Sequence, residues 1–217
     1  MTSSLVGSEM CIRDRNGTFL NAIGQRGEGP GEYREMDSFF VGKDCVYVCD
    51  MGKRTIYSYS FDGKFLHSLS FPYSLVFNDV VELPDGRFLC HRPSQSENCK
   101  GLWILDQKGR RVKNLLEYEK GTPCKNSYWN TLCAQEDGTI KIYNPVDGSY
   151  YQYDAVNDTV VRTMRQKSNL PMLADFHCSD RELYETKEEC TYSLFTVDGK
   201  NLVFSLWSFN SANKGMW

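Results

Sequence analysis

One turn-and-strand pattern recurs along this chain at nearly constant spacing. Four copies read NGTFLNAIG from Asn16, DGKFLHSLS from Asp62, KGRRVKNLL from Lys108 and NDTVVRTMR from Asn157. Their starts are 46, 46 and 49 residues apart. A repeat of this kind means that one structural unit is used several times, which restricts the fold to repeat architectures.

Short strand-like runs fill the intervals between these turns. Examples are CVYVCD (45–50), TIYSYS (55–60) and GLWILD (101–106), and the Asp-Gly pairs between such runs indicate β-hairpins. Each period holds about four strands without a helical pattern, and four strands in ~40–50 residues are typical of a β-propeller blade. The sequence therefore predicts an all-β fold, a partial β-propeller.

The repeats divide the chain into predicted blades. We expect an incomplete propeller domain over 16–217, with three complete blades at about 35–71, 77–117 and 127–165 and a lone outer strand (18–24) before them. Two strands of another blade fall within 189–207. The intervening 166–188 lacks strand alternation and is expected to be a partly helical insertion. Because the last blade has two strands, we interpret the chain as a fragment.

The first fifteen residues, MTSSLVGSEMCIRDR, follow a different pattern from the rest. They have neither the apolar core of a signal peptide nor the period of a helix or strand. The run LVGSEMCIRDR resembles a translated sequencing-adapter tail found at the starts of metagenomic genes. We therefore expect residues 1–15 to lie outside the fold and the true N-terminus, with any export signal, to be missing.

Charge and composition restrict the partners. The net charge of −3 provides no electrostatic basis for binding nucleic acid or an anionic membrane surface. No apolar run approaches the ~18 residues of a membrane span. The nine cysteines form no Cys-x-x-Cys pair and do not cluster with the three histidines, so a structural zinc site is not expected. Buried thiols are favoured, and a Cys90–Cys99 disulfide is the alternative if the protein is exported.

The stretch GQRGEGPGEY (24–33) concentrates glycine where the chain crosses from one predicted blade to the next. It lacks the strand–helix context of a dinucleotide-binding loop and the Gly-Lys-Ser/Thr end of a phosphate-binding loop. Two interpretations remain: a nest of backbone N–H groups that binds an anion, or a structural connector. We favour the connector, in which glycine permits left-handed turns, Pro30 stiffens the chain and Arg26 pairs with Glu28 or Glu32.

This connector, followed by FFVGKDCVYVCDMGKRTIYSYSFDGKFLHSL, resembles a bacterial six-bladed β-propeller family related to NHL-repeat proteins. The matching connector residues are Gly24, Arg26, Gly27, Gly29, Pro30, Gly31, Glu32 and Tyr33. The resemblance implies that the chain is part of a six-bladed ring. It also implies a periplasmic or cell-surface location, because members are commonly exported. Most members have no established activity.

The innermost strands of a propeller line its central channel, where functional groups often gather. Polar residues at these predicted positions are Asp37, Asn78, Asp79 and Asn130. Their oxygens could hold Ca²⁺, but their unequal spacing to the following turn glycine favours solvated or capping roles, without a required cofactor. His67 and His91 have no partner in the sequence and are expected to be surface or edge residues rather than catalytic bases.

These observations favour a non-enzymatic binding or scaffold propeller of the cell envelope, whose ligand is a protein or a carbohydrate. Aromatic runs such as GSYYQY (148–153) could stack on sugar rings, although packing between blades is the commoner role. The alternative is a Ca²⁺-dependent hydrolase of the lactonase type that uses Asp37, Asp79 and Asn130 as metal ligands.

Overall fold

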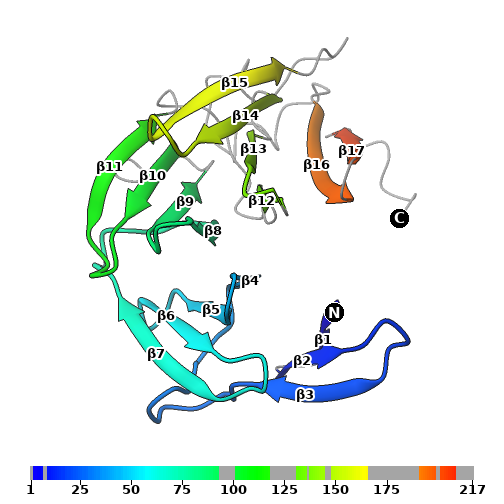
Figure 1. The fold of residues 1–217 in the computed structure, drawn as a ribbon, viewed down its shortest axis with the longest axis vertical. Helices are drawn as coiled ribbons and strands as arrows, with labels where there is room; N and C mark the ends of the chain where they lie inside the picture. Colours follow the sequence, from blue (N-terminus) through cyan, green and yellow to red (C-terminus); the bar gives the residue numbers. More distant parts are fainter. Residues whose placement is uncertain are drawn as a thin grey trace. The chain divides into compact units, whose positions relative to one another are not determined.

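The structure is a computed structural model that describes residues 2–6, 9–92, 101–117, 131–135, 137–144, 148–165, 191–198 and 201–208. Within these ranges, every regular element is a β-strand, and the strands form five sheets (Figure 1). The chain divides into two compact units: Met1–Val76 with Val80–Phe88 and Leu105–Val112, and Phe77–Asp79 with Leu89–Ile104 and Lys113–Trp217. The predicted insertion at 166–188 lies outside the described residues, as does Asn130.

The first four-stranded sheet is an antiparallel meander. Its strands are β4 (Ser38–Val41), β5 (Val46–Asp50), β6 (Thr55–Tyr59) and β7 (Phe65–Ser70), in that order. Val48 pairs with Phe39 on one side and with Tyr57 on the other, so apolar side chains align across one face. The turn into β7 contains Gly63 at a φ of 86°, which the Asp-Gly pair supplies without strain. β5 and β6 are buried throughout, whereas β7 is mostly exposed.

Two further four-stranded sheets have the same strand order. The first contains β8 (Asp79–Glu82), β9 (Phe88–Arg92), β10 (Gly101–Leu105) and β11 (Arg111–Leu116), and the second contains β12 (Leu132–Ala134), β13 (Ile140–Asn144), β14 (Ser149–Asp154) and β15 (Thr159–Arg165). β16 (Thr191–Asp198) and β17 (Asn201–Ser208) pair as a hairpin. Successive four-stranded meanders are propeller blades, and the prediction of a partial all-β propeller is confirmed.

The N-terminal residues differ from the expectation. β1 (Thr2–Val6) pairs with β2 (Glu9–Arg13), and β2 pairs with β3 (Phe19–Ile23), the outer strand expected to stand alone. Met10 and Ile12 are buried in the same cluster as Ile23. Residues 1–15 were expected to lie outside the fold, whereas in the structure alternate apolar side chains of β2 pack in the core.

Aromatic rings link β4 and β5 to the next sheet along the chain. Phe40 stacks on Tyr47 with ring centroids 4.5 Å apart, and Phe88 of β9 meets the Tyr47 ring edge-on at 5.4 Å. The Tyr47 hydroxyl donates a hydrogen bond of 2.9 Å to Glu82 Oε1. Burial raises the pKa of Tyr47, and the neighbouring Cys45 thiol and Glu82 carboxylate add to this effect. The ring therefore stays a neutral hydrogen-bond donor within an apolar contact.

Candidate functional site

The glycine-rich connector between β3 and β4 holds its own anion. The carboxylate of Glu32 accepts a hydrogen bond of 2.8 Å from the Gly29 N–H and another from the Gln25 side chain. These donors lower the pKa of Glu32, Gly29 contributing most. A Cβ placed on Gly27 would lie 1.9 Å from Glu32 Oε2, so this fold of the loop needs glycine there. The alternative prediction was that backbone N–H groups of this loop bind an anion from solution; in the structure, the Gly29 N–H binds the Glu32 carboxylate of the chain itself.

Lysine and arginine side chains brace the same connector. Lys53, from the turn after β5, donates hydrogen bonds to the carbonyls of Gly27 (2.7 Å) and Glu32 (2.9 Å) and lies 3.3 Å from Glu28 Oε2. Arg34 Nε bonds Glu28 Oε1 at 2.9 Å. The hydrogen bond from Arg34, and then that from Lys53, lowers the pKa of Glu28. The prediction that Arg26 pairs with Glu28 or Glu32 was wrong. Glu28 instead forms ion pairs with Arg34 and Lys53.

The rest of the connector is fixed by aromatic residues. Tyr33 is buried in the core cluster that also contains Tyr59, and the Tyr59 hydroxyl donates a 2.7 Å hydrogen bond to the Gly31 carbonyl. Gly24 and Gly31 have φ values of 62° and 74°, and a Cβ at either would lie within 2.7 Å of an aromatic ring. Pro30 is exposed. Every contact here is made within the chain itself.

Asp37 and Asn78, two of the predicted channel residues, each form a hydrogen bond beside the sheet that they precede. Asp37 lies just before β4, and its Oδ2 accepts a 2.6 Å hydrogen bond from the Met51 N–H. Asn78 lies just before β8 and donates its backbone N–H to the His91 carbonyl at 2.9 Å. The described residues contain no group of three His, Cys, Asp or Glu side chains placed to hold a metal ion.

Asp79 instead joins a buried polar chain. Asp79 Oδ2 accepts a 2.8 Å hydrogen bond from the Leu132 N–H, which ties β8 to the first residue of β12. The Thr131 hydroxyl lies 3.5 Å from the same oxygen and 2.6 Å from His91 Nδ1. The exposed fractions are 8% for Asp79, 2% for Thr131 and 0% for His91. A carboxylate engaged in this way links two sheets through short polar contacts.

His91 was expected at the surface, and this was wrong. It lies within β9, the second strand of its sheet, where burial lowers its pKa from 6.5 to about 3. The neutral ring needs a hydrogen-bond partner in this setting, and Thr131 supplies one. His67 lies exposed on β7, as expected. Thr131 was missed because it is forty residues from His91, and no local pattern indicates which strands meet.

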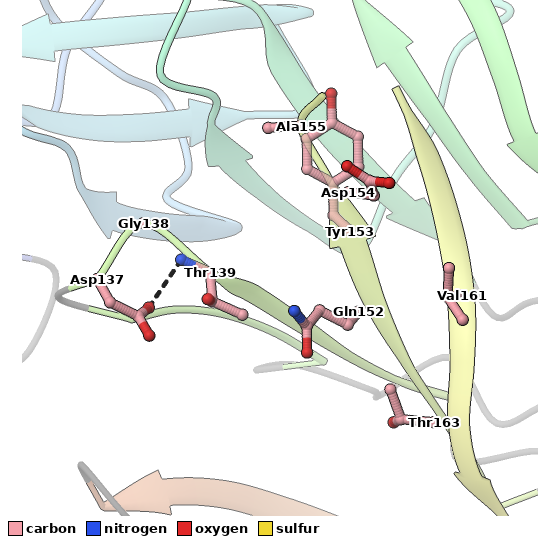
Figure 2. A pocket seen from close by; sticks show the side chains of 9 residues that line it. All are labelled: Asp137, Gly138, Thr139, Gln152, Tyr153, Asp154, Ala155, Val161 and Thr163. Atoms are coloured by element: carbon pink, nitrogen blue, oxygen red, sulfur yellow. Dashed lines mark hydrogen bonds between the residues drawn. The ribbon is translucent and has the colours of Figure 1, made fainter. Parts of the chain in front are cut away.

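An open pocket lies on the sheet formed by β12 to β15. Its volume is about 480 Å³, and its lining residues are Asp137, Gly138, Thr139, Gln152, Tyr153, Asp154, Ala155, Val161 and Thr163. Figure 2 shows Gln152 between Thr139 and Thr163 among the lining side chains. Of the tyrosines in the GSYYQY run, Tyr150 and Tyr153 are each 5% exposed, whereas Tyr151 is partly exposed.

The two pocket carboxylates are already oriented by turns. Asp137 accepts a 2.9 Å hydrogen bond from the Thr139 N–H (Figure 2), and Asp154 accepts hydrogen bonds from Asn157 and from the Val156 N–H. These hydrogen bonds lower the pKa of both carboxyl groups, Thr139 and Asn157 being the main causes. The pocket therefore presents ionised carboxylates, hydroxyls and an amide, and none of the described residues that line it is cationic.

The four-stranded meanders define the chain as part of a β-propeller. In it, Asp79, Thr131 and His91 form a chain of buried polar contacts. Residues 5–214 match the family described as a domain of unknown function, DUF4934. The chain belongs to this family. No curated protein matches the sequence. In the described part of the chain, no helix has the length and apolar character needed to cross a membrane.

Three solved structures illustrate the similarity of this fold to known proteins. A Bacteroides fragilis NCTC 9343 protein, provisionally named as exported, is 19% identical with a TM-score of 0.63, over 94% of this chain and 67% of that one. A DUF4221 member from Bacteroides vulgatus ATCC 8482 is 10% identical with a TM-score of 0.58, over 96% and 67%. A streptogramin B lyase is 10% identical with a TM-score of 0.50, over 94% and 62%. These identities show likeness of fold alone.

Proposed function

We propose that this chain is a non-enzymatic binding module of the bacterial cell envelope, part of a six-bladed NHL-like propeller. The observation that carries the proposal is the open pocket on β13 to β15, whose hydroxyl, amide and carboxylate groups are exposed for a ligand. Polar groups of this kind give orientation and specificity to a bound molecule. By contrast, Asp79 and His91 are buried and bonded within the chain, which suits a scaffold role.

The envelope location rests on likeness to other proteins. The Bacteroides fragilis structure, similar over 94% of this chain, is provisionally named as exported. The resemblance of the connector to exported six-bladed propellers agrees with that location. The net charge of −3 gives the module no attraction for nucleic acid, so a protein or a carbohydrate remains the expected partner.

A ligand screen of the full chain tests the proposal. Soluble oligosaccharides and short peptides would be screened by saturation-transfer NMR, and each hit would be titrated by calorimetry. Gln152→Ala should weaken binding at the pocket several-fold, because it removes the amide that lines the pocket. Lys64→Ala, at a side chain that is 79% exposed on a different sheet, is the matched control and should leave affinity unchanged. The pocket assignment would be contradicted if Gln152→Ala weakened none of the hits.

The Ca²⁺-dependent hydrolase is tested separately. A metal that binds the native state raises the melting temperature as its concentration increases, by about 2.7 kcal/mol of stabilisation at a hundredfold excess over Kd. Because Asp79 already accepts the Leu132 N–H, we expect no saturable shift on Ca²⁺ titration. A saturable shift that Asp79→Asn abolishes would overturn the binding-module proposal in favour of the hydrolase.

A further inference from the structure

A second set of exposed groups lies where the turn between β5 and β6 meets the segment that follows β7. Arg54 in this turn has a φ of 54°, and the other positive-φ residue in the described chain that is not glycine is Asp158. A left-handed conformation is unfavourable for a residue with a Cβ, so surrounding contacts must hold it. The Arg54 carbonyl accepts the Phe71 N–H at 2.9 Å, and its Nη1 donates to the Leu75 carbonyl at 3.1 Å.

These contacts place the Arg54 guanidinium against an aromatic ring. Its Cζ lies 5.3 Å from the centroid of the Tyr73 ring, within cation–π range. Tyr73 is 76% exposed, so one face of the ring rests on the guanidinium and the other is open to water. An aromatic side chain fixed from beneath loses little further freedom when a ligand stacks on it, which favours binding.

Asp37 adds a hydrogen-bond acceptor to this corner. The Met51 N–H, from the same turn as Arg54, bonds its Oδ2, and the carboxylate is otherwise exposed. Partial loss of water raises the pKa of Asp37, the Met51 N–H opposes this, and the positive charge of Arg54 makes a smaller contribution that also lowers the pKa. The corner therefore combines an aromatic face, a carboxylate and a guanidinium from three segments of one compact unit.

We propose that Asp37, Arg54 and Tyr73 form a subsite for the ring of a neutral sugar. The apolar C–H face of a pyranose stacks on the open face of Tyr73, whose other face rests on Arg54, while a sugar hydroxyl donates to the Asp37 carboxylate. Asp37 and its acidic neighbours Glu35 and Asp50 repel phosphates and uronic acids, and Arg54 repels cations. This subsite is separate from the pocket on β13 to β15 and names a ligand class for the binding module.

The test uses the full chain and neutral disaccharides of glucose, galactose, mannose and N-acetylglucosamine as probes. Saturation-transfer NMR should show contact to at least one of them, and calorimetry gives its Kd. Tyr73→Ala should weaken binding at least tenfold, Asp37→Asn should weaken it several-fold, and Tyr73→Phe should keep it because the ring remains. Tyr73 is exposed, so these variants should keep the wild-type melting temperature.

Matched variants separate this inference from the proposed function. Gln152→Ala should leave disaccharide binding at the corner unchanged, because it alters the other pocket. Binding that falls in Gln152→Ala but not in Tyr73→Ala would support the pocket and overturn the corner. A wild-type chain that binds none of the four disaccharides would also overturn it, while peptide binding at the pocket could still stand.

Discussion

The His91 imidazole lies fully buried, 2.6 Å from the Thr131 hydroxyl, and this position determines its protonation. Thr131 has one hydroxyl proton, which can go to His91 Nδ1 or to Asp79 Oδ2. The 2.6 Å contact to His91 is much shorter than the 3.5 Å contact to Asp79. The donor at the His91–Thr131 contact therefore depends on the tautomer of the ring: with the Thr131 proton directed at Asp79, the His91 Nδ1–H donates to the Thr131 oxygen.

This residue should make the folded state sensitive to acid. In the folded chain the pKa of His91 is lowered to about 3, whereas in the unfolded chain it returns to its ordinary 6.5. Below pH 6.5 His91 therefore binds a proton in the unfolded state but not in the folded state, and the free energy of unfolding decreases as the pH is lowered. The slope approaches ~1.4 kcal/mol per pH unit, which amounts to about 2 kcal/mol between pH 6.5 and 5. Urea unfolding at several pH values measures this dependence of the free energy of unfolding on pH.

His91→Gln provides the control for that measurement. The amide can still bond Thr131 but does not titrate, so the variant should be less stable at pH 7.5 and lose stability less steeply on acidification. Equal slopes for the two proteins between pH 6.5 and 5 would show that His91 does not stay neutral in the fold.

At the scale of single elements, the turns of the connector between β3 and β4 could be predicted from the sequence, but the side chains that stabilise it could not. The glycines and Pro30 are consecutive, so their turn-forming role could be predicted from local pattern. Lys53 could not be predicted as a brace, because it is 26 residues from the Gly27 carbonyl that it bonds. Long-range partners depend on how strands pack, and residue type alone does not indicate that.

Glycine substitutions test how tightly this element is held. Gly31→Ala forces a Cβ into a φ of 74° and places it 2.5 Å from Phe65 Cγ. We expect a loss of ~1–2 kcal/mol from the backbone conformation and a further ~1–3 kcal/mol from overpacking. Gly17→Ala, with a φ of 82° and no atom within 4 Å of the added Cβ, should show the first cost alone. Urea unfolding compares them, and equal losses would mean that Phe65 moves aside freely.

At the scale of the whole molecule, the period of the turns was enough to predict the four-stranded sheets. Asp-Gly turns and alternating apolar residues are local signals, and the structure has strands where these signals occur. The candidate site was less predictable. Asp79 was identified from its position at the start of a blade, but its partners Thr131 and Leu132 lie more than fifty residues further along the chain. The residue type of Asp79 could not show whether its carboxylate binds a metal ion or accepts a buried hydrogen bond from another sheet.

The aromatic contact between successive sheets should contribute strongly to stability. Phe88→Ala removes the ring that meets Tyr47 at 5.4 Å, and we expect a loss of ~3–5 kcal/mol, as for other buried phenylalanines. Tyr47→Phe removes the hydrogen bond to Glu82 and should cost ~1 kcal/mol. Val41→Ala, at a side chain that is 59% exposed, should stay within ~0.5 kcal/mol. Denaturation midpoints rank the three, and a small loss for Phe88→Ala would contradict this packing.

The bracing of the connector also has a consequence for the order of events during synthesis. The groups that fix residues 27–32 come later in the chain: Lys53 reaches back to Gly27, and the Tyr59 hydroxyl reaches back to Gly31. Residues 27–32 therefore leave the ribosome before the side chains that will hold them exist. The connector must stay open until β5 and β6 have been made and paired. The segment that precedes the first complete blade in sequence is thus ordered by that blade, and becomes ordered after it.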